Sequence, residues 1–369
     1  MLLTVILLLF LTQKTFADTK TAKSYCVINS VTGEIVAEKN SVTMLPMAST
    51  TKIMTLLVAL KNSNPEDVVT VSKTAVSEEG SSAYLKPGAK ITMRDLCYGL
   101  MLNSGNDAAV AIAEYISETP DKFAELMNST AEEIGVLNTH FVNPNGLHND
   151  DHFTTASDLA KLTRCAMKND TFREIVSSRI YTSTMLLPDG TTENVEYINH
   201  NRLLKELDGC IGVKTGFTKT AGRCLVSAVN RNGAEYIIVT LNDSDDWSTH
   251  KELCEMAFDS MSERKILKKG DCMKHAVSGK EECELVVKSD FSVFVNRNNN
   301  SFEIIKHMPG TVDFPLNKGE KVGFVEIKAN GETIGTVDVV AKNNFEPKGD
   351  TQLKNCFKFT FINILRNLI

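Results

Sequence analysis

The stretch MASTTKIMT, residues 47–55, places Ser49 three residues before Lys52 at the start of an apolar run. Residues at positions i and i+3 of a helix lie on one face. A serine hydroxyl becomes an effective nucleophile when a neighbouring base removes its proton, and lysine serves as that base once burial and nearby positive charge lower its pKa. The first turn of such a helix also offers unpaired N–H groups to a developing oxyanion. The spacing indicates acyl-transfer chemistry, although Ser-x-x-Lys also occurs by chance in many proteins.

A second motif lies in the segment MLNSGNDAAV, where Ser104 stands two residues before Asn106. Ser104 can relay a proton between Lys52 and a departing amine. Asn106 can hold a substrate amide because its side chain both donates and accepts hydrogen bonds. We therefore expect both side chains to face the pair formed by Ser49 and Lys52.

A third motif, Lys214-Thr215-Gly216-Phe217, stands just before two strand-like runs. Lys214 supplies a positive field for a terminal carboxylate, and Thr215 supplies a hydroxyl to bind it. Gly216 lets a substrate backbone approach closely and join the strand as an antiparallel neighbour. We expect the backbone N–H groups of Ser49 and Phe217 to form the oxyanion hole.

Together and in this order, the three motifs are similar to the signature of penicillin-binding proteins and class A β-lactamases. The stretches that carry a closer resemblance are PMASTTKIMT, YGLMLNSGNDAAVAIAE, FVNPNGLHNDDHFTTASDLA and GVKTGFTKTAGRCLVSA. They resemble the low-molecular-mass penicillin-binding proteins, which are serine-type D-alanyl-D-alanine carboxypeptidases of peptidase family S11. The resemblance covers roughly residues 24–262, and the β-rich region and tail that follow also fit it.

The resemblance implies an α/β (α+β) fold with a β-lactamase/transpeptidase-like catalytic domain. It implies a hydrolase that needs no cofactor or metal, removes the terminal D-Ala from peptidoglycan pentapeptides ending in D-Ala-D-Ala, and binds β-lactam antibiotics covalently. Carried over by motif, Ser49 is the nucleophile that forms the acyl-enzyme, Lys52 the general base and Ser104 the helper. The implied substrate-binding residues are Asn106, Lys214, Thr215, Gly216 and Phe217.

Three other functions match parts of the pattern. A class A β-lactamase shares the acylation residues but carries Glu-x-x-x-Asn between the second and third motifs, and no glutamate there has Asn four residues later. A non-catalytic wall-binding relative would lack Ser49 or Lys52, and both are present. A metal peptidase is disfavoured because His148 and His152 follow a Pro-Asn-Gly loop and no His-Glu-x-x-His occurs.

The length of 369 residues suits two domains. We expect a catalytic domain over residues 18–265 and a small all-β domain over 275–342, separated near a polar segment at 263–283. In the second domain, Asn330-Gly331 between two alternating runs predicts a hairpin. The net charge of −6 argues weakly against nucleic acid as a partner.

Within the catalytic domain, strand-like runs come first and last, with helical patterns between them. A hairpin is expected around Thr32-Gly33, and another joins residues 224–230 to 235–241. Strand patterns also follow Ile180. Helices are expected over 52–60, 93–102, 108–116, 120–135, 156–167 and 247–261. This order predicts a mixed sheet built from both ends of the domain.

The two ends of the chain carry localisation signals. Residues 1–17, MLLTVILLLFLTQKTFA, have the short apolar run and small-residue end of a secretory signal. The tail at 350–369 includes NCFKFTFINILRNLI, whose helical pattern is amphipathic and predicts a membrane-surface anchor or, alternatively, a helix docked on its own protein. We therefore expect an exported protein at the outer face of the bacterial cytoplasmic membrane or in the cell wall. Nine widely spaced cysteines without Cys-x-x-Cys predict free, half-buried thiols.

Overall fold

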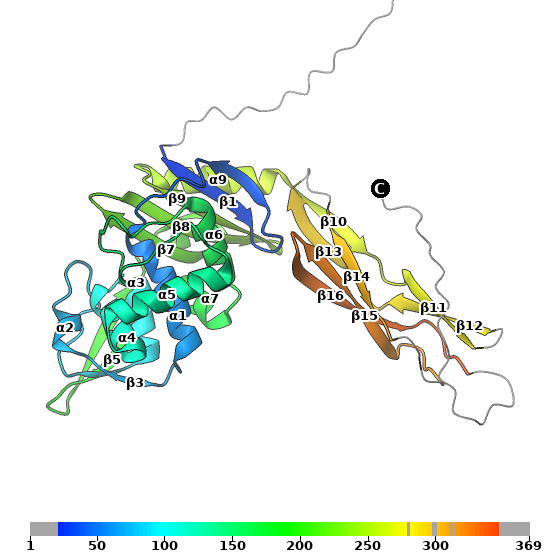
Figure 1. Cartoon of the computed structure of the whole chain (residues 1–369), viewed down its shortest axis with the longest axis horizontal. Helices are drawn as coiled ribbons and strands as arrows, with labels where there is room; N and C mark the ends of the chain where they lie inside the picture. The colour runs from blue at the N-terminus through cyan, green and yellow to red at the C-terminus, as the bar shows by residue number, and fades with distance from the viewer. Residues whose placement is uncertain (1–20, 279–280, 297–300, 310–311, 313–314, 347–369) are drawn as a thin grey trace, which may run out of the picture.

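The computed structural model describes residues 21–278, 281–296, 301–309, 312 and 315–346. Figure 1 shows a body of helices and strands formed by the first part of the chain, followed by an elongated set of strands. The proposed signal at 1–17 and the proposed anchor at 350–369 lie outside the described residues. Among the helices that the structure describes, none is both long and apolar enough to cross a membrane.

A five-stranded sheet with the order β2-β1-β9-β8-β7 forms the frame of the first body. The strands are β1 (Ser24–Asn29), β2 (Ile35–Lys39), β7 (Cys210–Thr218), β8 (Gly222–Arg231) and β9 (Ala234–Leu241). The sheet is therefore built from both ends of the domain, as its sequence pattern predicts. The expectation of a mixed sheet is wrong, because every strand pair described in it is antiparallel. The β1–β2, β7–β8 and β8–β9 pairs are hairpins, whose short connections require this direction.

Helices cover both faces of this sheet. α6 (Ala156–Ala166) packs against β1 and β9 on one face, and α9 (Asp246–Asp259) packs against β8 and β9 on the other. Residues on β9 alternate between the two layers: Ile237 belongs to the core on the α6 side, and Ile238 belongs to the core on the α9 side. Because both faces are covered, every residue of β9 is buried.

The central helix of the body is α1 (Lys52–Asn62), which contacts five neighbouring helices. Its residues 52–59 are all buried, so this part of the helix is covered on every side and Lys52 lies in the core with it. The neighbours are α3 (Met93–Leu102), α4 (Asn106–Ser117), α5 (Pro120–Ile134), α6 and α7 (Asp170–Ser177), and the short helices are α2 (Lys73–Val76) and α8 (Leu203–Glu206).

Side-chain caps fix where several of these helices begin. The hydroxyls of Thr92, Thr119 and Thr155 accept hydrogen bonds from the backbone N–H groups three residues later. These caps explain why α3, α5 and α6 begin at the residues that the sequence predicts. At the other end of the domain, the helix expected over 247–261 ends earlier, and Met261 is the first residue of β10.

A second, four-stranded sheet lies beside the helices, with the order β3-β4-β5-β6. Its strands are β3 (Val68–Thr70), β4 (Lys90–Thr92), β5 (Ile180–Leu186) and β6 (Thr192–Ile198). Tyr197 on β6 is fully buried and lies close to Gly99 of α3, so this sheet supports the helix that leads into the second motif.

The remaining strands form the all-β part. β10 (Met261–Leu267) pairs with β13 (Phe291–Asn296), and a five-stranded sheet has the order β11-β12-β16-β15-β14. Its strands are β11 (Cys272–Ser278), β12 (Glu281–Val287), β14 (Glu303–His307), β15 (Lys321–Ala329) and β16 (Glu332–Ala341). The hairpin predicted at Asn330-Gly331 is confirmed, with both turn residues at positive φ of 51° and 80°.

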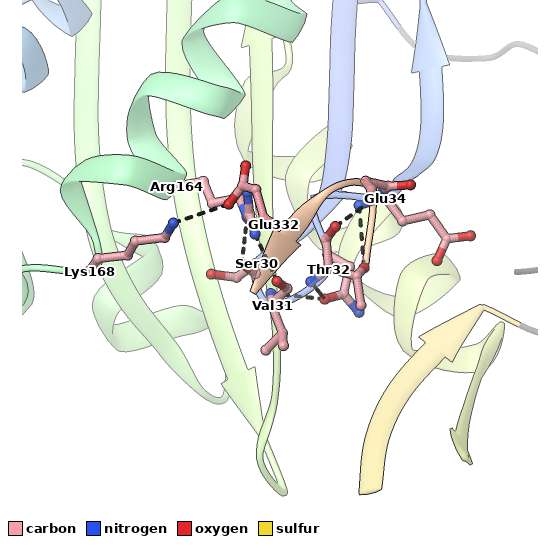
Figure 2. A network of polar contacts seen from close by, with 9 residues as sticks. Ser30, Val31, Thr32, Glu34, Arg164, Lys168 and Glu332 are labelled. Carbon is pink, nitrogen blue, oxygen red and sulfur yellow. Dashed lines mark hydrogen bonds and ion pairs between the residues drawn. The ribbon is translucent and has the colours of Figure 1, made fainter. Parts of the chain in front are cut away.

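The turn of this hairpin reaches back to the first body (Figure 2). Arg164 of α6 donates from Nη1 to Glu332 at 2.9 Å and from Nε and Nη2 to the carbonyls of Ser30 and Val31 at 2.7 Å. Lys168 adds a 3.2 Å contact to the same carboxylate. We call these residues the interdomain latch. Next to it, Asn330 donates to the carbonyl of Thr32 at 3.1 Å.

The cysteines in the described part of the chain are free thiols, as their spacing predicts. Cys356 lies outside that part. Five of the described thiols are buried, and burial raises the pKa of Cys97 to about 12. These cysteines therefore pack as small hydrophobic side chains.

Candidate functional site

The first motif folds into a tight turn followed by α1. Ser49 is half-buried in the 3-10 turn η1 (Ala48–Thr51), and Lys52 is the first residue of α1. Ala48 adopts a positive φ of 49°, a conformation that non-glycine residues rarely hold and that clusters at functional sites. The hydroxyls of Thr50 and Thr51 donate to the carbonyls of Met47 and Ala48 at 2.6 and 2.8 Å. These bonds fix the turn that presents Ser49.

Lys52 is the centre of a hydrogen-bond network. Its Nζ lies 3.1 Å from the Ser49 hydroxyl, 2.7 Å from Asn106 Oδ1 and 2.6 Å from the carbonyl of Asn145. The side chain is fully buried. The structure therefore brings together the serine and the amine that the sequence pairs, with the amide of the second motif as a third member.

Burial lowers the pKa of Lys52 well below its usual value, and the ammonium group of Lys214 lowers it further. The carboxylates of Asp107 and Glu78 act in the opposite direction. Desolvation is the largest of these effects, so the net shift of the pKa favours the neutral amine. A neutral amine next to a serine hydroxyl can accept its proton.

The second motif forms the loop between α3 and α4. Ser104 is 5 % exposed with a positive φ of 58°, and Asn106 begins α4 with only 4 % of its surface exposed. Asn106 accepts from Lys52 through Oδ1 and donates through Nδ2 to the carbonyl of Glu79 at 2.6 Å. No hydrogen bond joins Ser104 to Lys52 among the residues that the structure describes. The loop therefore binds Lys52 through Asn106 in this state.

Asp107 holds this loop in place. Its carboxylate accepts hydrogen bonds from the backbone N–H groups of Ala83 and Leu85 and from the hydroxyl of Ser82 at 2.6–3.2 Å. A Cβ at Gly105 would lie 2.7 Å from this carboxylate and 2.8 Å from the backbone nitrogen of Ala83. The close packing explains why a glycine separates the two polar residues of the motif.

The third motif lies on β7, directly beside η1, which we call the serine turn. Lys214 is 2 % exposed, its Nζ donates to the carbonyl of Thr215 at 2.9 Å, and burial lowers its pKa to about 7. Thr215 is half-buried, while the side chain of Phe217 is 65 % exposed. Two lysines thus flank the serine turn, one on α1 and one on β7.

Gly216 has a structural role that the sequence interpretation missed. A Cβ at this position would lie 3.0 Å from the backbone nitrogen of Ser49, 3.1 Å from that of Thr50 and 3.2 Å from the Cβ of Ala48. The glycine therefore allows the strand to approach the turn that presents Ser49, whereas the predicted approach of substrate backbone stays a prediction. This packing holds β7 against η1.

Sequence reasoning also missed the loop at residues 143–147 as part of the site. The carbonyl of Asn145 accepts from Lys52, and its Nδ2 donates to the Glu78 carboxylate at 2.7 Å. A Cβ at Gly146 would lie 2.0 Å from the carbonyl oxygen of Ala48, so this loop packs against the serine turn. The Pro-Asn-Gly sequence was a turn signal, but nothing in its spacing points to Lys52.

His152 holds the same turn through Thr51, the last residue before α1. Val142 N–H donates to its Nδ1 at 3.0 Å, so Nε2 carries the hydrogen and donates to the Thr51 hydroxyl at 2.8 Å. Burial lowers the pKa of His152 to about 4, which keeps the ring neutral at physiological pH. Through these contacts His152 has a structural role, because it holds the turn that presents Ser49.

Comparisons with known proteins agree with this geometry. A sequence model of the D-alanyl-D-alanine carboxypeptidase family S11 matches residues 12–245, and a model of the penicillin-binding protein 5 C-terminal domain matches residues 262–347. The chain is 30 % identical over 341 residues to the D-alanyl-D-alanine carboxypeptidase DacF of Bacillus subtilis, which covers 89 % of this chain and 87 % of the relative. It is 29 % identical over 362 residues to DacC of Escherichia coli, covering 91 % and 87 %.

Solved structures show the same relationship. The crystal structure of a Streptomyces DD-transpeptidase superposes with a TM-score of 0.61 at 35 % identity, covering 65 % of this chain and 97 % of that one. The D-alanyl-D-alanine carboxypeptidase DacD of Francisella tularensis superposes with a TM-score of 0.62 at 28 % identity, covering 89 % and 94 %. The matched region contains all three motifs, and the chain belongs to the D-alanyl-D-alanine carboxypeptidase family, peptidase family S11.

Proposed function

We propose that the protein is a serine D-alanyl-D-alanine carboxypeptidase that forms an acyl-enzyme on Ser49. The observation that carries this proposal is the buried Lys52 amine, 3.1 Å from the Ser49 hydroxyl, in a turn that packs directly against Gly216 of β7. Family membership supplies the reaction type, and the geometry supports the roles that we propose for the side chains.

In the first step, the neutral amine of Lys52 removes the proton of Ser49 while Oγ attacks the carbonyl carbon of the penultimate D-Ala. The backbone N–H groups of Ser49 and Phe217 stabilise the developing oxyanion; removing one such donor typically costs about 3–4 kcal/mol of barrier. The C–N bond then breaks, and Ser104 relays the proton from Lys52 to the departing amine of the terminal D-Ala. Water hydrolyses the resulting ester and restores the Ser49 hydroxyl.

Substrate recognition uses side chains and backbone groups on both sides of Ser49, from β7 and from the loop of the second motif. The protonated amine of Lys214 attracts the terminal carboxylate, and the Thr215 hydroxyl donates a hydrogen bond to it. Asn106 is engaged by Lys52 and by the carbonyl of Glu79, but one lone pair of Oδ1 and one hydrogen of Nδ2 remain for a substrate amide. The strand β7 offers its backbone to an extended peptide, because it lies at the edge of its sheet.

Reaction with benzylpenicillin tests the assignment, because a β-lactam acylates the same nucleophile. We expect intact-mass measurement to show one adduct that maps to Ser49 and that Ser49→Ala abolishes. On the same preparation, D-Ala release from a peptide ending in D-Ala-D-Ala should be fast while the penicilloyl ester persists. A folded sample without an adduct would refute the nucleophile, and rapid turnover of penicillin would favour a serine β-lactamase.

The segments outside the described residues support a proposal on location. An apolar leader at 1–17 and an amphipathic tail at 350–369 fit an exported protein held at the outer face of the cytoplasmic membrane. Deletion of residues 350–369 should move the protein from the membrane pellet to the soluble fraction without changing its reaction with penicillin. Continued pelleting of the shortened chain would refute the anchor.

A further inference from the structure

A single short segment outside the three motifs supports two of the groups that bind Lys52. This segment, Glu78-Glu79-Gly80, follows α2. The Glu78 carboxylate accepts from Asn145 Nδ2 at 2.7 Å, and the carbonyl of Glu79 accepts from Asn106 Nδ2 at 2.6 Å. Both Asn145 and Asn106 in turn accept hydrogen bonds from the Lys52 amine. The segment is therefore connected to Lys52 in two ways, through Asn145 and through Asn106.

Gly80 makes this approach possible. It has a φ of +95°, and a Cβ there would lie 2.8 Å from Asn106 Nδ2. A side chain at this position would push the segment away from the loop of the second motif. The contact of Glu79 with Asn106 depends on that space, whereas the contact of Glu78 with Asn145 uses its side chain.

The side chains of Glu78 and Glu79 differ in their environment. Glu78 is half-buried, and its carboxylate is bound to Asn145, which is 2 % exposed. Glu79 is exposed and contributes its backbone carbonyl to the network. Two adjacent residues of identical chemistry therefore occupy different positions relative to Lys52.

We propose that Glu78 is a positioning residue for Lys52: it anchors the Asn145 loop so that the Asn145 carbonyl receives the amine, and it places a negative charge beside the base. The inference rests on the proposed function, because it concerns the base of that reaction. If this is so, the charge of Glu78 influences the pH below which the acylation rate of Ser49 declines.

The direction of this effect follows from the charges around Lys52. The groups that face it are Lys214 on β7, Asp107 on α4, Glu78 after α2 and the neutral His152 in the loop after α5. Lys214 lowers the pKa of Lys52, while Asp107 and Glu78 raise it. Loss of the Glu78 charge therefore lowers the pKa of Lys52 and leaves the amine neutral at a lower pH.

The test is the pH dependence of the acylation rate by benzylpenicillin in three full-length variants. Glu78→Gln keeps an acceptor for Asn145 but removes the charge. We expect the acidic side of its rate profile to move to lower pH. At acidic pH, where the wild-type rate is still rising, the variant should be acylated about three- to tenfold faster. Its plateau rate should be unchanged. Glu78→Ala removes the anchor as well, and we expect its plateau rate to fall.

Glu79→Gln is the matched control, because it removes the same charge from the neighbouring residue and keeps the backbone carbonyl. Its acylation profile should match that of the wild type. Identical profiles for Glu78→Gln and Glu79→Gln would overturn the inference, as would a Glu78→Gln effect confined to hydrolysis of the penicilloyl ester. Failure of the wild-type protein to be acylated at Ser49 would instead refute the proposed function.

Discussion

Two buried lysines flank Ser49, and the tasks that we propose for them require opposite protonation states. In the proposed mechanism, Lys52 acts as a base when neutral, and Lys214 attracts a carboxylate when charged. Both side chains are almost fully buried, and burial lowers both pKa values, with that of Lys214 reaching about 7. The charge on Lys214 lowers the pKa of Lys52 further. The proposed reaction requires a pH range in which Lys52 is neutral while Lys214 is charged.

The need for a charged Lys214 predicts that kcat/KM falls at alkaline pH. Below pH about 7 Lys214 is protonated in the free enzyme, and above it the positive charge is progressively lost. We expect kcat/KM for a peptide ending in D-Ala-D-Ala to fall about tenfold per pH unit on the alkaline side. Lys214→Arg should abolish this limb, because guanidinium stays charged there.

The measurement is a pH series of kcat/KM for both proteins, with circular dichroism to show that Lys214→Arg is folded. An unchanged alkaline limb in the folded variant would show that another group causes it.

The residues that could be predicted at this scale are those with fixed spacing in the chain. The contacts among Ser49, Lys52 and Asn106 follow from the first two motifs. Asn145 and Glu78 could not be predicted, because Asn145 binds Lys52 and Glu78 binds Asn145 through tertiary contacts that no motif spacing indicates. The internal role of Gly216 was hidden for the same reason.

At the scale of elements, the site depends on the contact between the strand β7 and the turn η1. A Cβ on Gly216 would press on backbone nitrogens, which cannot rotate away as a flexible side chain can. A residue larger than glycine at position 216 would therefore push the strand β7 and the turn η1 apart.

Gly216→Ala should lower the rate of acylation by penicillin at least tenfold and destabilise the fold by about 1–3 kcal/mol. The reason is that the alanine must displace the turn that presents Ser49. The measurements are stopped-flow acylation and chemical denaturation.

Gly190→Ala is a suitable control for that prediction. Gly190 has a φ of +85° in the β5–β6 turn, and a Cβ added there would meet no atom of the described residues within 4 Å. Alanine there should cost about 1–2 kcal/mol of stability from backbone strain and leave acylation unchanged. Equal losses of acylation in the two variants would show that lower stability, not the strand–turn contact, is responsible.

Long, periodic elements were predictable, and short ones were not. The helix α3 begins and ends as expected, and α5 and α6 agree within one residue at their C-terminal ends. The strands β3 and β4 were missed because each has three residues and is stabilised by pairing with distant segments. The helix α7 was missed, although its Asn169 cap is visible in the sequence.

At the scale of the molecule, the interdomain latch joins the all-β part to the first body (Figure 2). Arg164 is 10 % exposed, while Glu332 is 52 % exposed, so the ion pair is partly solvated and contributes about 1 kcal/mol or less. The Arg164 bonds to the carbonyls of Ser30 and Val31 lie within the first body and do not involve Glu332.

Glu332→Arg should therefore loosen the contact between the two parts without unfolding either one, because it places three positive groups together. We expect a larger radius of gyration by small-angle X-ray scattering and unchanged acylation by penicillin. Glu303→Arg, on the exposed surface of β14, makes the same charge change away from the latch and should leave the radius of gyration as in the wild type. The same radius for both variants would refute a role for the latch.

The presence of an all-β part and of its Asn330-Gly331 hairpin could be predicted from alternation and turn chemistry. The docking of that hairpin could not, because Asn330 meets Thr32 across almost the whole chain and a surface turn gives no sign of its partner.

The position of β1 bears on how the protein is made. This strand lies between β2 and β9, so residues 24–29 pair with residues 236–241. A nascent chain that has already released the first two motifs from the ribosome still lacks the strand that closes its sheet. Contacts of such large sequence separation form slowly. Maturation of the site therefore waits for the last strands of the domain, and a chain that stops before them leaves the β1 edge open to pairing with other molecules.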